Sequence, residues 1–456
     1  MQPPAAHWSA SNWLKSHPRR LVLIGASVRS AAQSAKRAGF LVTGIDLFGD
    51  TDARAACERF FLLGDERLEF KLLSHCSGLP SLIVGGTNQS NDLVGRLQSI
   101  CPPLQESVAS NPSSDGNPAV PWQPACWKDP EWLEHLAERA GVNFPETYSS
   151  FPMGSPPRTE YSTVGNSRWL VKSLQGSGGL GVQWHVSERH HSRRARNSRL
   201  SGPNETPNRS VIYQRWVPGR AIGVTYLMHV KRSHMVGVCR SLWKRQGRLP
   251  FVYGGSIGPI QLPDSLDGAL RGLGETIATE TQVCGLINVD LIIDRRDRPW
   301  LLEINPRWSG SCEVLESAIQ ARRGSASLFR DDLDAKLGSL SAPFYEEDDS
   351  TSLSIWMKRI LFARRDVRFQ LDKVQRALAS GVSIHDIPSE GAHVRRGEPI
   401  CTLLQQMALG ATASLRSADS SLQYVHEKNP MREHRVQVNR LHDALSAHHS
   451  DRNESC

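Results

Sequence analysis

Three oxygen-bearing side chains, Asp290, Glu303 and Asn305, lie on two apolar segments that a short charged turn separates. The segments have the sequences NVDLII and LLEIN, and residues 294–298 lie between them. Glu303 and Asn305 are two residues apart, so a strand presents both on one face, and pairing the segments brings Asp290 to them. Carboxylate and amide oxygens suit Mg²⁺, whose coordination substrate phosphates and water usually complete. A solvated hairpin is the alternative, but it does not explain Glu303 among apolar neighbours.

A candidate phosphate cradle lies upstream. Lys172 is part of the apolar segment WLVKSL, where a lysine without an anion is costly to bury. A glycine-rich segment follows, with the residues Gly176, Ser177, Gly178, Gly179, Leu180 and Gly181. Glycines let backbone N–H groups turn toward one point and approach an anion closely. Because the lysine precedes the glycines, this is not a Walker A motif. A hairpin turn with a chance lysine also fits this segment taken alone.

The elements that must position these residues begin with an alternation of strands and helices. Apolar runs that end in glycine or an acid, at 20–25, 40–46 and 81–86, accompany a helical segment at 30–38. This alternation predicts a parallel α/β unit over residues 19–103.

The first strand of this unit ends at Gly25, where a dinucleotide-binding turn would lie. The next residues are Ala-Ser-Val-Arg-Ser and do not match G-x-G-x-x-G, although Asp46 follows roughly 20 residues later, as a ribose-binding acid would. We therefore expect a structural unit whose first turn borders a substrate pocket, rather than a dinucleotide site.

The metal and phosphate motifs define a central domain at residues 125–330. Residues 104–124 before it are rich in Ser, Pro, Asn and Gly, which marks a linker. Alternating apolar residues and a Gly-Glu-Pro turn in 331–410 predict a small C-terminal β-rich unit. We interpret residues 1–18 as an N-terminal extension and 411–456 as a polar tail with one helix.

The composition argues against several classes of protein. The chain has 456 residues, a net charge of +8, and no apolar run of the ~18 residues that a membrane helix needs. Its nine cysteines form no CxxC pair, which leaves a zinc ribbon without support. The N-terminus has no signal-peptide core, so we expect a cytoplasmic protein, and a homo-oligomer stays open.

Some of the positive charge is concentrated at 189–199, within a predicted insertion at 189–209. A basic run can bind nucleic acid. This run leads into SGPNETPNRS and has no interleaved aromatic residues, so a solvated insertion is the favoured interpretation. A basic surface also suits anionic substrates such as nucleotides.

Three motifs in the central domain resemble those of the ATP-grasp superfamily. The segment VKSLQGSGGLGV is similar to its lysine strand and glycine flap, and IYQRWVPG resembles its adenine-binding linker. The segment NVDLIIDRRDRPWLLEINPRWSG resembles its metal-binding strand pair and ends in the superfamily's Asn-Pro-Arg. FVYGGSIGPIQLP, at 251–263, and DIPSEGAHVRRGEPICTLL are most similar to a subgroup that includes tyramine–glutamate ligase and proteins of one-carbon cofactor gene sets.

The resemblance implies a fold and a reaction. The fold is an α/β pre-grasp domain followed by two α+β subdomains that grip ATP, here with the small C-terminal β-rich unit. The reaction is an ATP- and Mg²⁺-dependent ligation of a small-molecule carboxylate to an amine through an acyl phosphate, and Mn²⁺ is an allowed substitute. The implied setting is the biosynthesis of a cofactor linked to one-carbon metabolism.

The resemblance also implies roles around the phosphates. Asp290, Glu303 and Asn305 would hold Mg²⁺. Lys172, together with a more loosely spaced Lys128, would contact phosphates. The flap would cover the β- and γ-phosphates through Gly176, Ser177, Gly178, Gly179 and Gly181.

The remaining implied roles concern the base and the transferred group. Gln214 would meet the adenine amino group, with the backbone of Trp216 and Val217 as a hinge. Arg307 would stabilise the transferring phosphoryl group or the acyl phosphate, and Arg240 would help.

One position departs from the superfamily pattern. Many members have a glutamate after the linker glycine to bind ribose, whereas this chain has Arg220-Ala221-Ile222. Two other functions stay open: a bicarbonate-using carboxylase or carbamoyl-phosphate type of enzyme, and a non-catalytic nucleotide- or nucleic-acid-binding protein. The sequence contains no Met-Lys-Met biotin-carrier segment, which argues against the first function. A non-catalytic protein would have no need for the three predicted metal ligands, which argues against the second.

Overall fold

The computed structural model describes ten stretches of the chain. They are residues 19–86, 91–104, 126–152, 168–174, 176–185, 211–229, 231–324, 326–338, 354–407 and 438–445. The predicted N-terminal extension, the basic insertion and all but residue 104 of the predicted linker lie outside the described residues.

The first unit is a parallel four-stranded sheet with the order β3-β2-β1-β4. Side chains alternate along β1, so that Leu21 and Leu23 face α2 while Val22 and Ile24 face α4 and α5. Both faces are therefore buried, as a parallel sheet requires. The elements are β1 (Arg20–Ile24), α2 (Arg29–Arg37), β2 (Leu41–Asp46), α3 (Thr51–Ala56), β3 (Arg59–Leu62), α4 (Leu68–Cys76), β4 (Ser81–Ile83) and α5 (Asn91–Ile100).

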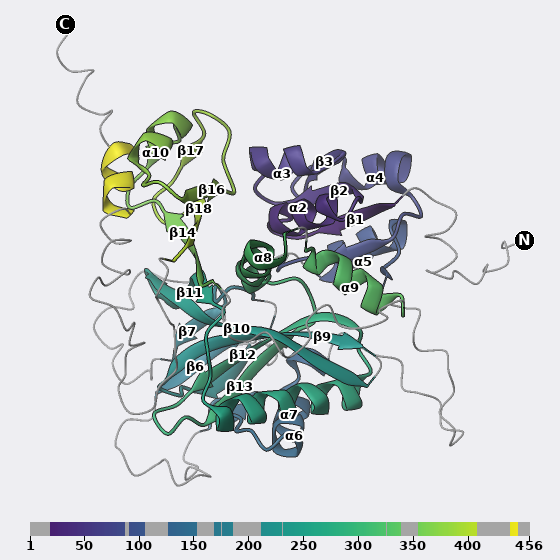
Figure 1. Cartoon of the computed structure of the whole chain (residues 1–456), viewed down its shortest axis with the longest axis vertical. Coiled ribbons are helices and arrows are strands. Elements are labelled where there is room, and N and C mark those ends of the chain that lie inside the picture. The colour runs from purple at the N-terminus through teal and green to yellow at the C-terminus, as the bar shows by residue number, and fades with distance from the viewer. Residues whose placement is uncertain are drawn as a thin grey trace, which may run out of the picture.

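The largest element of the molecule is an antiparallel eight-stranded sheet with the order β13-β12-β9-β10-β11-β14-β18-β16. The long helix α7 packs on one face, and α8 and α9 pack on the other, between the sheet and the first unit (Figure 1). The elements of the central domain in this layer are β9 (Arg220–His229), β10 (Arg232–Gln246), β11 (Leu249–Gly258), α7 (Asp264–Thr281), β12 (Gly285–Ile293), β13 (Pro299–Asn305), α8 (Gly310–Arg323) and α9 (Leu328–Lys336).

A second, smaller sheet has the order β5-β8-β6-β7. It carries the predicted lysine strand, the glycine segment and the linker strand, and it precedes the large sheet in the chain. The elements are η2 (Cys126–Lys128), α6 (Pro130–Arg139), β5 (Thr147–Tyr148), β6 (Trp169–Ser173), β7 (Val182–Trp184) and β8 (Val211–Arg215).

The C-terminal unit differs in one respect from the small separate β unit predicted from sequence. Three of its strands continue the large sheet, because β14 pairs antiparallel with β11 and leads on to β18 and β16. A helix at 438–445, within the predicted polar tail, packs Val438, Leu441 and Leu445 into the core of this unit. The elements are β14 (Trp356–Phe362), β15 (Val367–Arg368), α10 (Leu371–Ala377), β16 (Val382–His385), β17 (His393–Val394) and β18 (Pro399–Gln406).

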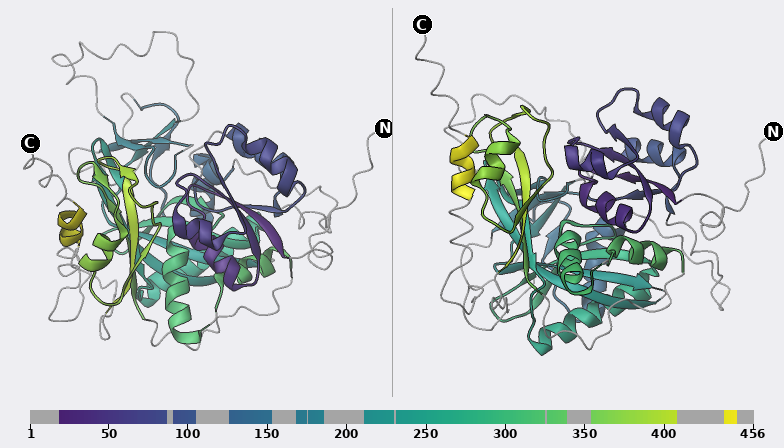
Figure 2. Two further views of the ribbon diagram at one scale, coloured as in Figure 1. Left: turned by 90° about the horizontal axis from the view of Figure 1, so that it is seen from above. Right: turned by 45° about the horizontal axis from the view of Figure 1, so that its top comes forward.

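The C-terminal unit and the first unit lie beside each other above the large sheet (Figure 2). Backbone N–H groups of Asp386 and Ile387 donate to the Asp52 carboxylate, and the Thr51 N–H donates to the Ile387 carbonyl. Three parts of the chain that are distant in sequence therefore meet around α8. Among the described helices, none is both long and apolar enough to cross a membrane.

Candidate functional site

The three predicted metal ligands converge at one end of the β12–β13 pair. The register places Asp290 opposite Glu303 and Asn288 opposite Asn305. The Asn305 side-chain amide donates to Asp290 Oδ2 and to Glu303 Oε1, at 3.1 Å each. Strand alternation and strand pairing together therefore bring three side chains to one point.

The two carboxylates share a buried environment. Burial, and then the charge of Glu303, hold the pKa of Asp290 well above its usual range. Burial also opposes ionisation of Glu303, but Lys172 and the hydrogen bonds with Asp290 and Asn305 outweigh it and lower the Glu303 pKa. A cation between the two carboxylates would favour the ionised form of both.

The donor set fits Mg²⁺. Two carboxylates and one amide supply oxygen ligands and leave positions for phosphate oxygens and water. The Asn305 amide now directs its nitrogen toward both carboxylates, so an ion between them would require the amide to turn and present Oδ1.

The sequence interpretation missed Asn288. Its side-chain nitrogen donates to Asp290 Oδ1 at 2.9 Å, and its oxygen accepts from Ser311 Oγ at 2.9 Å and from Ser309 Oγ at 3.3 Å. Asn288 therefore orients Asp290 and links it to the start of α8. The available signal was its position two residues before Asp290, which places both side chains on one face.

Three cationic side chains from separate elements surround the carboxylates. Lys172 and Arg307 both lower the pKa of Glu303, and Lys128 interacts electrostatically with Glu303, Arg307 and Lys172. Burial lowers the pKa of Lys128, while the charge of Glu303 opposes this effect. Arg307 donates to Asn305 Oδ1 at 3.0 Å. The structure thus brings together both predicted lysines and the predicted arginine, and this cluster suits a polyanion next to a divalent ion.

Gln214 is buried, and both ends of its amide are engaged. The oxygen accepts from Lys172 Nζ at 3.1 Å and the nitrogen donates to Thr147 Oγ1 at 3.1 Å. In this structure Gln214 holds Lys172 in place, and its adenine contact stays a prediction. The predicted hinge at Trp216 and Val217 joins β8 of the small sheet to β9 of the large one.

The glycine segment folds into a turn between β6 and β7 that rests on β11. The Gly178 carbonyl accepts from the Tyr253 N–H at 2.9 Å. Gly179 has φ +76°, and a Cβ there would lie 1.7 Å from the Phe251 carbonyl oxygen. Gly176 and Gly181 also lie against each other, since a Cβ on Gly176 would meet the Gly181 Cα at 2.9 Å. This close approach explains why the segment needs glycines.

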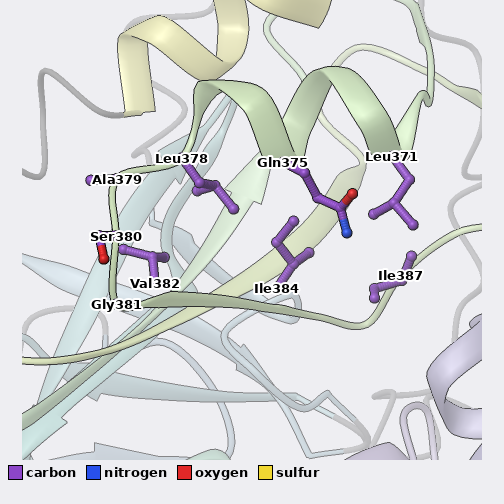
Figure 3. A pocket seen from close by; sticks show the side chains of 9 residues that line it. All are labelled: Leu371, Gln375, Leu378, Ala379, Ser380, Gly381, Val382, Ile384 and Ile387. Atoms are coloured by element: carbon purple, nitrogen blue, oxygen red, sulfur yellow. The ribbon is translucent and has the colours of Figure 1, made fainter.

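A small cavity of about 30 Å³ lies between the two sheets. Its lining includes the predicted residues Lys128, Lys172, Gly176, Gln214 and Glu303. A larger hollow of about 420 Å³ lies on the C-terminal unit, between α10 and β16 (Figure 3). The residues that line that hollow carry no charged side chain, so the charged side chains mark the smaller cavity as the candidate site.

The prediction for Arg240 needs correction. In the register of the large sheet, Arg240 lies opposite Ile222, and Ile222 lies opposite Leu291. Asp290, the neighbour of Leu291, lies in the adjacent cross-strand row with Gly223 and Cys239. Neighbouring residues on a strand point to opposite faces. The register therefore directs Arg240 to the sheet face opposite the carboxylates, and it is not part of this cluster.

Asp46 has a structural position rather than a ribose-binding one. Its carboxylate is buried and accepts backbone hydrogen bonds from Val28, Phe48 and Gly49. These bonds fix the turn after β1 and the loop after β2.

Comparison with known sequences identifies the part of the chain that carries the site. Residues 131–311 match the family model described as the ATP-grasp domain. An uncharacterised protein of Methanocaldococcus jannaschii is 21% identical over 403 residues, which cover 84% of this chain and 88% of that protein.

Solved structures match almost the whole chain. An L-amino acid ligase from Bacillus licheniformis has a TM-score of 0.57 at 13% identity, and the match covers 94% of this chain and 98% of that one. The chain has the ATP-grasp fold. A carboxyaminoimidazole ribonucleotide synthase from Aspergillus clavatus, complexed with ATP, has a TM-score of 0.57 at 14% identity, with coverages of 94% and 98%.

A third similar structure is the biotin carboxylase domain of a Hydrogenobacter thermophilus 2-oxoglutarate carboxylase, in complex with MgADP and bicarbonate. Its TM-score is 0.56 at 12% identity, with coverages of 85% of this chain and 86% of that one. The fold class predicted from sequence is therefore confirmed, and the residues that match the ATP-grasp domain model include the carboxylate cluster and the glycine segment.

Proposed function

We propose that this protein is an ATP- and Mg²⁺-dependent ligase that joins a carboxylate to an amine through an acyl phosphate. The observation that carries the proposal is the convergence of Lys128, Lys172 and Arg307 on the paired carboxylates of Asp290 and Glu303. A divalent ion between these carboxylates, with three cations around it, matches the charge of a nucleotide triphosphate. The L-amino acid ligase and the ATP complex among the similar structures support this interpretation.

In the proposed mechanism, each group of this chain acts by position and charge. Asp290, Glu303 and Asn305 would hold Mg²⁺, which when bound neutralises charge on phosphate oxygens. Lys172, oriented by Gln214, would contact the phosphates, and Arg307 would face the group in transfer. Such preorganised charges stabilise the spread-out negative charge of a transferring phosphoryl group.

The glycine flap has a further part in the proposed mechanism. Its backbone N–H groups would face the β- and γ-phosphates, and its closure against β11 would keep water from the acyl phosphate. Attack by the substrate carboxylate on the γ-phosphate releases ADP. Attack by the amine on the acyl carbon then forms the amide and releases phosphate.

Bicarbonate is a second candidate for the carboxylate substrate, because one of the similar structures is a bicarbonate complex. The finer assignment, a cofactor pathway linked to one-carbon metabolism, depends on the resemblance of residues 251–263 and of the segment DIPSEGAHVRRGEPICTLL. The first of these segments includes most of β11, against which the flap rests.

The test is an assay of acid-dependent ADP release. The protein is incubated with MgATP and with each protein amino acid, other small carboxylic acids or bicarbonate, with and without hydroxylamine. We expect one class of acid to stimulate ADP release and to give a hydroxamate, since hydroxylamine traps acyl phosphates. Glu303→Gln should lower this rate on the order of 100-fold, and Glu134→Gln, an exposed acid on α6, should not.

Three outcomes would contradict the proposal or redirect it. Stimulation by bicarbonate alone would favour the carboxylase type of enzyme. Absence of ADP release with every acid would favour a non-catalytic nucleotide-binding protein. Near wild-type turnover in Glu303→Gln would remove the metal assignment.

A further inference from the structure

A second charged cluster lies where the first unit, α8 and the C-terminal unit meet. Arg29, with 1% of its side chain exposed, donates to Glu313 on α8 and to Asp386 in the loop after β16. Lys358 on β14 forms an ion pair with Glu313 at 2.7 Å. Lys358 and Arg29 thus compensate Glu313, and the same two cations also interact electrostatically with Asp386 of the C-terminal unit.

Four aspartate carboxylates, those of Asp46, Asp50, Asp52 and Asp386, interact electrostatically at this junction, and three of them have hydrogen-bond partners. Asp46 accepts three backbone hydrogen bonds. Asp52 accepts from the backbone of the loop after β16, and its Oδ2 lies 3.7 Å from Arg29 Nε. Asp386 accepts from Arg29 Nε at 2.9 Å and from Ser27 Oγ at 3.2 Å.

Asp50 is the exception. It is 7% exposed, and its carboxylate has neither a hydrogen bond nor an ion pair within the described part of the chain. Burial, followed by the charges of Asp386, Asp46 and Asp52, raises the pKa of Asp50 to about 8, and Arg29 only partly opposes them. A buried carboxylate without a partner destabilises the folded protein.

The surplus negative charge indicates which ligand would compensate it. No three His, Cys, Asp or Glu side chains of the described residues are arranged to hold a metal ion, so the acids around Asp50 do not form a metal cage. The neighbouring His385 adds little positive charge, because burial lowers its pKa. An organic ammonium group is the cation that matches this site.

The site is next to the candidate phosphate site. Arg307, which faces the carboxylate pair, is followed by Trp308. The Trp308 indole donates to Ser30 Oγ at 3.0 Å, and its carbonyl accepts from Gly85. Ser30 directly follows Arg29 in the first turn of α2, so Trp308 links Arg307 of the first cluster to the residue next to Arg29 of the second.

We propose that Asp50, together with Asp46, Asp52 and Asp386, binds the protonated amine substrate of this protein. The ligand class is a small molecule with a primary ammonium group. Its assignment as the nucleophile of a ligase rests on the proposed function above, but binding of the cation does not.

The first test measures thermal unfolding of the full-length protein with 1,4-diaminobutane at pH 8.5. The neutral isostere 1,4-butanediol and NaCl at matched ionic strength are the controls for the ligand. We expect the diamine to raise the unfolding temperature of the wild type by about 2 °C or more through preferential binding to the folded state. It should do so equally in Asp372→Asn, an exposed acid on α10, and not in Asp50→Asn.

The second test compares Asp50→Asn with the wild type without ligand between pH 5 and 9. The Asp50 pKa is higher in the folded than in the unfolded chain, so the wild type loses stability as pH rises toward 8. Asp50→Asn should unfold at a higher temperature, by a margin that grows with pH. A purely structural carboxylate would give a destabilised variant at every pH.

The outcomes separate this proposal from the proposed function. No diamine effect on the wild type, an equal effect on Asp50→Asn, or a destabilised Asp50→Asn would overturn the cation site. A diamine effect that depends on Asp50, in a protein that forms no ADP with any acid, would keep the cation site and refute the ligase.

Discussion

At the scale of single residues, the candidate active site combines two carboxylates with three cationic side chains that come from separate segments of the chain. Asp290 and Glu303 share one buried position, and Lys128, Lys172 and Arg307 reach it from η2, β6 and the end of β13. Each cation lowers the cost of keeping the carboxylates ionised. The three cations therefore offset part of the penalty that burial imposes on ionisation of this carboxylate pair, which we propose binds the metal ion.

Lys172 allows the first prediction at this scale. Lys172→Met keeps the length of the side chain but removes the charge that Gln214 orients. A hydrogen bond to a charged group contributes about 1.5–3 kcal/mol, so we expect the dissociation constant of MgATP to rise about 10- to 100-fold. Isothermal calorimetry measures it, with Lys373→Met on α10 as the control. An unchanged dissociation constant would show that Lys172 does not contribute to nucleotide binding.

The residue scale also shows what the sequence allows and what it does not. The convergence of Asp290, Glu303 and Asn305 follows from strand alternation, which is a local property. The face that Arg240 occupies depends on its register with Ile222, and a register is not visible in one segment. The environment of Asp50 cannot be predicted from the sequence, because the groups that surround it come from distant parts of the chain.

At the scale of elements, the glycine flap is closed against β11 through Gly178 and Gly179. The cavity that it covers, about 30 Å³, is far smaller than the roughly 300–1,000 Å³ of a ligand pocket. The proposed function therefore requires the flap to lift from β11 to admit a nucleotide and to return to cover it.

Gly179→Ala tests this closure. The added Cβ would collide with the Phe251 carbonyl at a backbone conformation that alanine rarely adopts. We expect turnover to fall at least about tenfold because the flap cannot settle on β11. The matched control is Gly247→Ala, which has φ +57° but no neighbour within 4 Å, so it carries the conformational cost alone. Equal turnover in the two variants, measured in the ADP assay, would argue against a closing flap.

The elements themselves were more predictable than their pairing. The α/β alternation of the first unit and the hairpin around residues 294–298 agree with the structure, because both depend on local periodicity. The union of β14, β18 and β16 with the large sheet depends on contacts across roughly 100 residues. No local pattern reports such a contact, so the C-terminal strands were expected to form a separate unit.

At the scale of the whole molecule, Arg29 joins three parts of the chain through Glu313 and Asp386. Arg29→Met leaves both acids without their main partner, and breaking a buried pair costs about 3–5 kcal/mol. We expect a loss of this size in urea unfolding. Arg20→Met is the control, because Arg20 is 42% exposed in its ion pair with Glu58 and should change stability by about 0–1 kcal/mol. Equal losses in both variants would refute a special role for Arg29.

The same cluster makes the stability of the folded protein depend on pH in the acid range. Despite burial, Arg29 lowers the pKa of Asp386 to about 2, and Arg29 and Lys358 lower the pKa of Glu313 well below its usual range. These groups stabilise the fold above their unfolded pKa of about 4 and lose that effect as pH falls toward 2. We expect the stability of the wild type to decline steeply across this interval and that of Arg29→Met less steeply. Parallel declines in the two proteins would contradict this origin.

The pairing of β11 with β14 has a consequence for synthesis on the ribosome. β11 ends at Gly258, but the strand that covers its outer edge begins at Trp356. At about 5–20 residues per second, roughly 5–20 seconds pass before translation supplies that partner. Until then the nascent chain presents an open strand edge with the sequence LPFVYGGSIG, the kind of edge that recruits chaperones or pairs with a neighbouring chain.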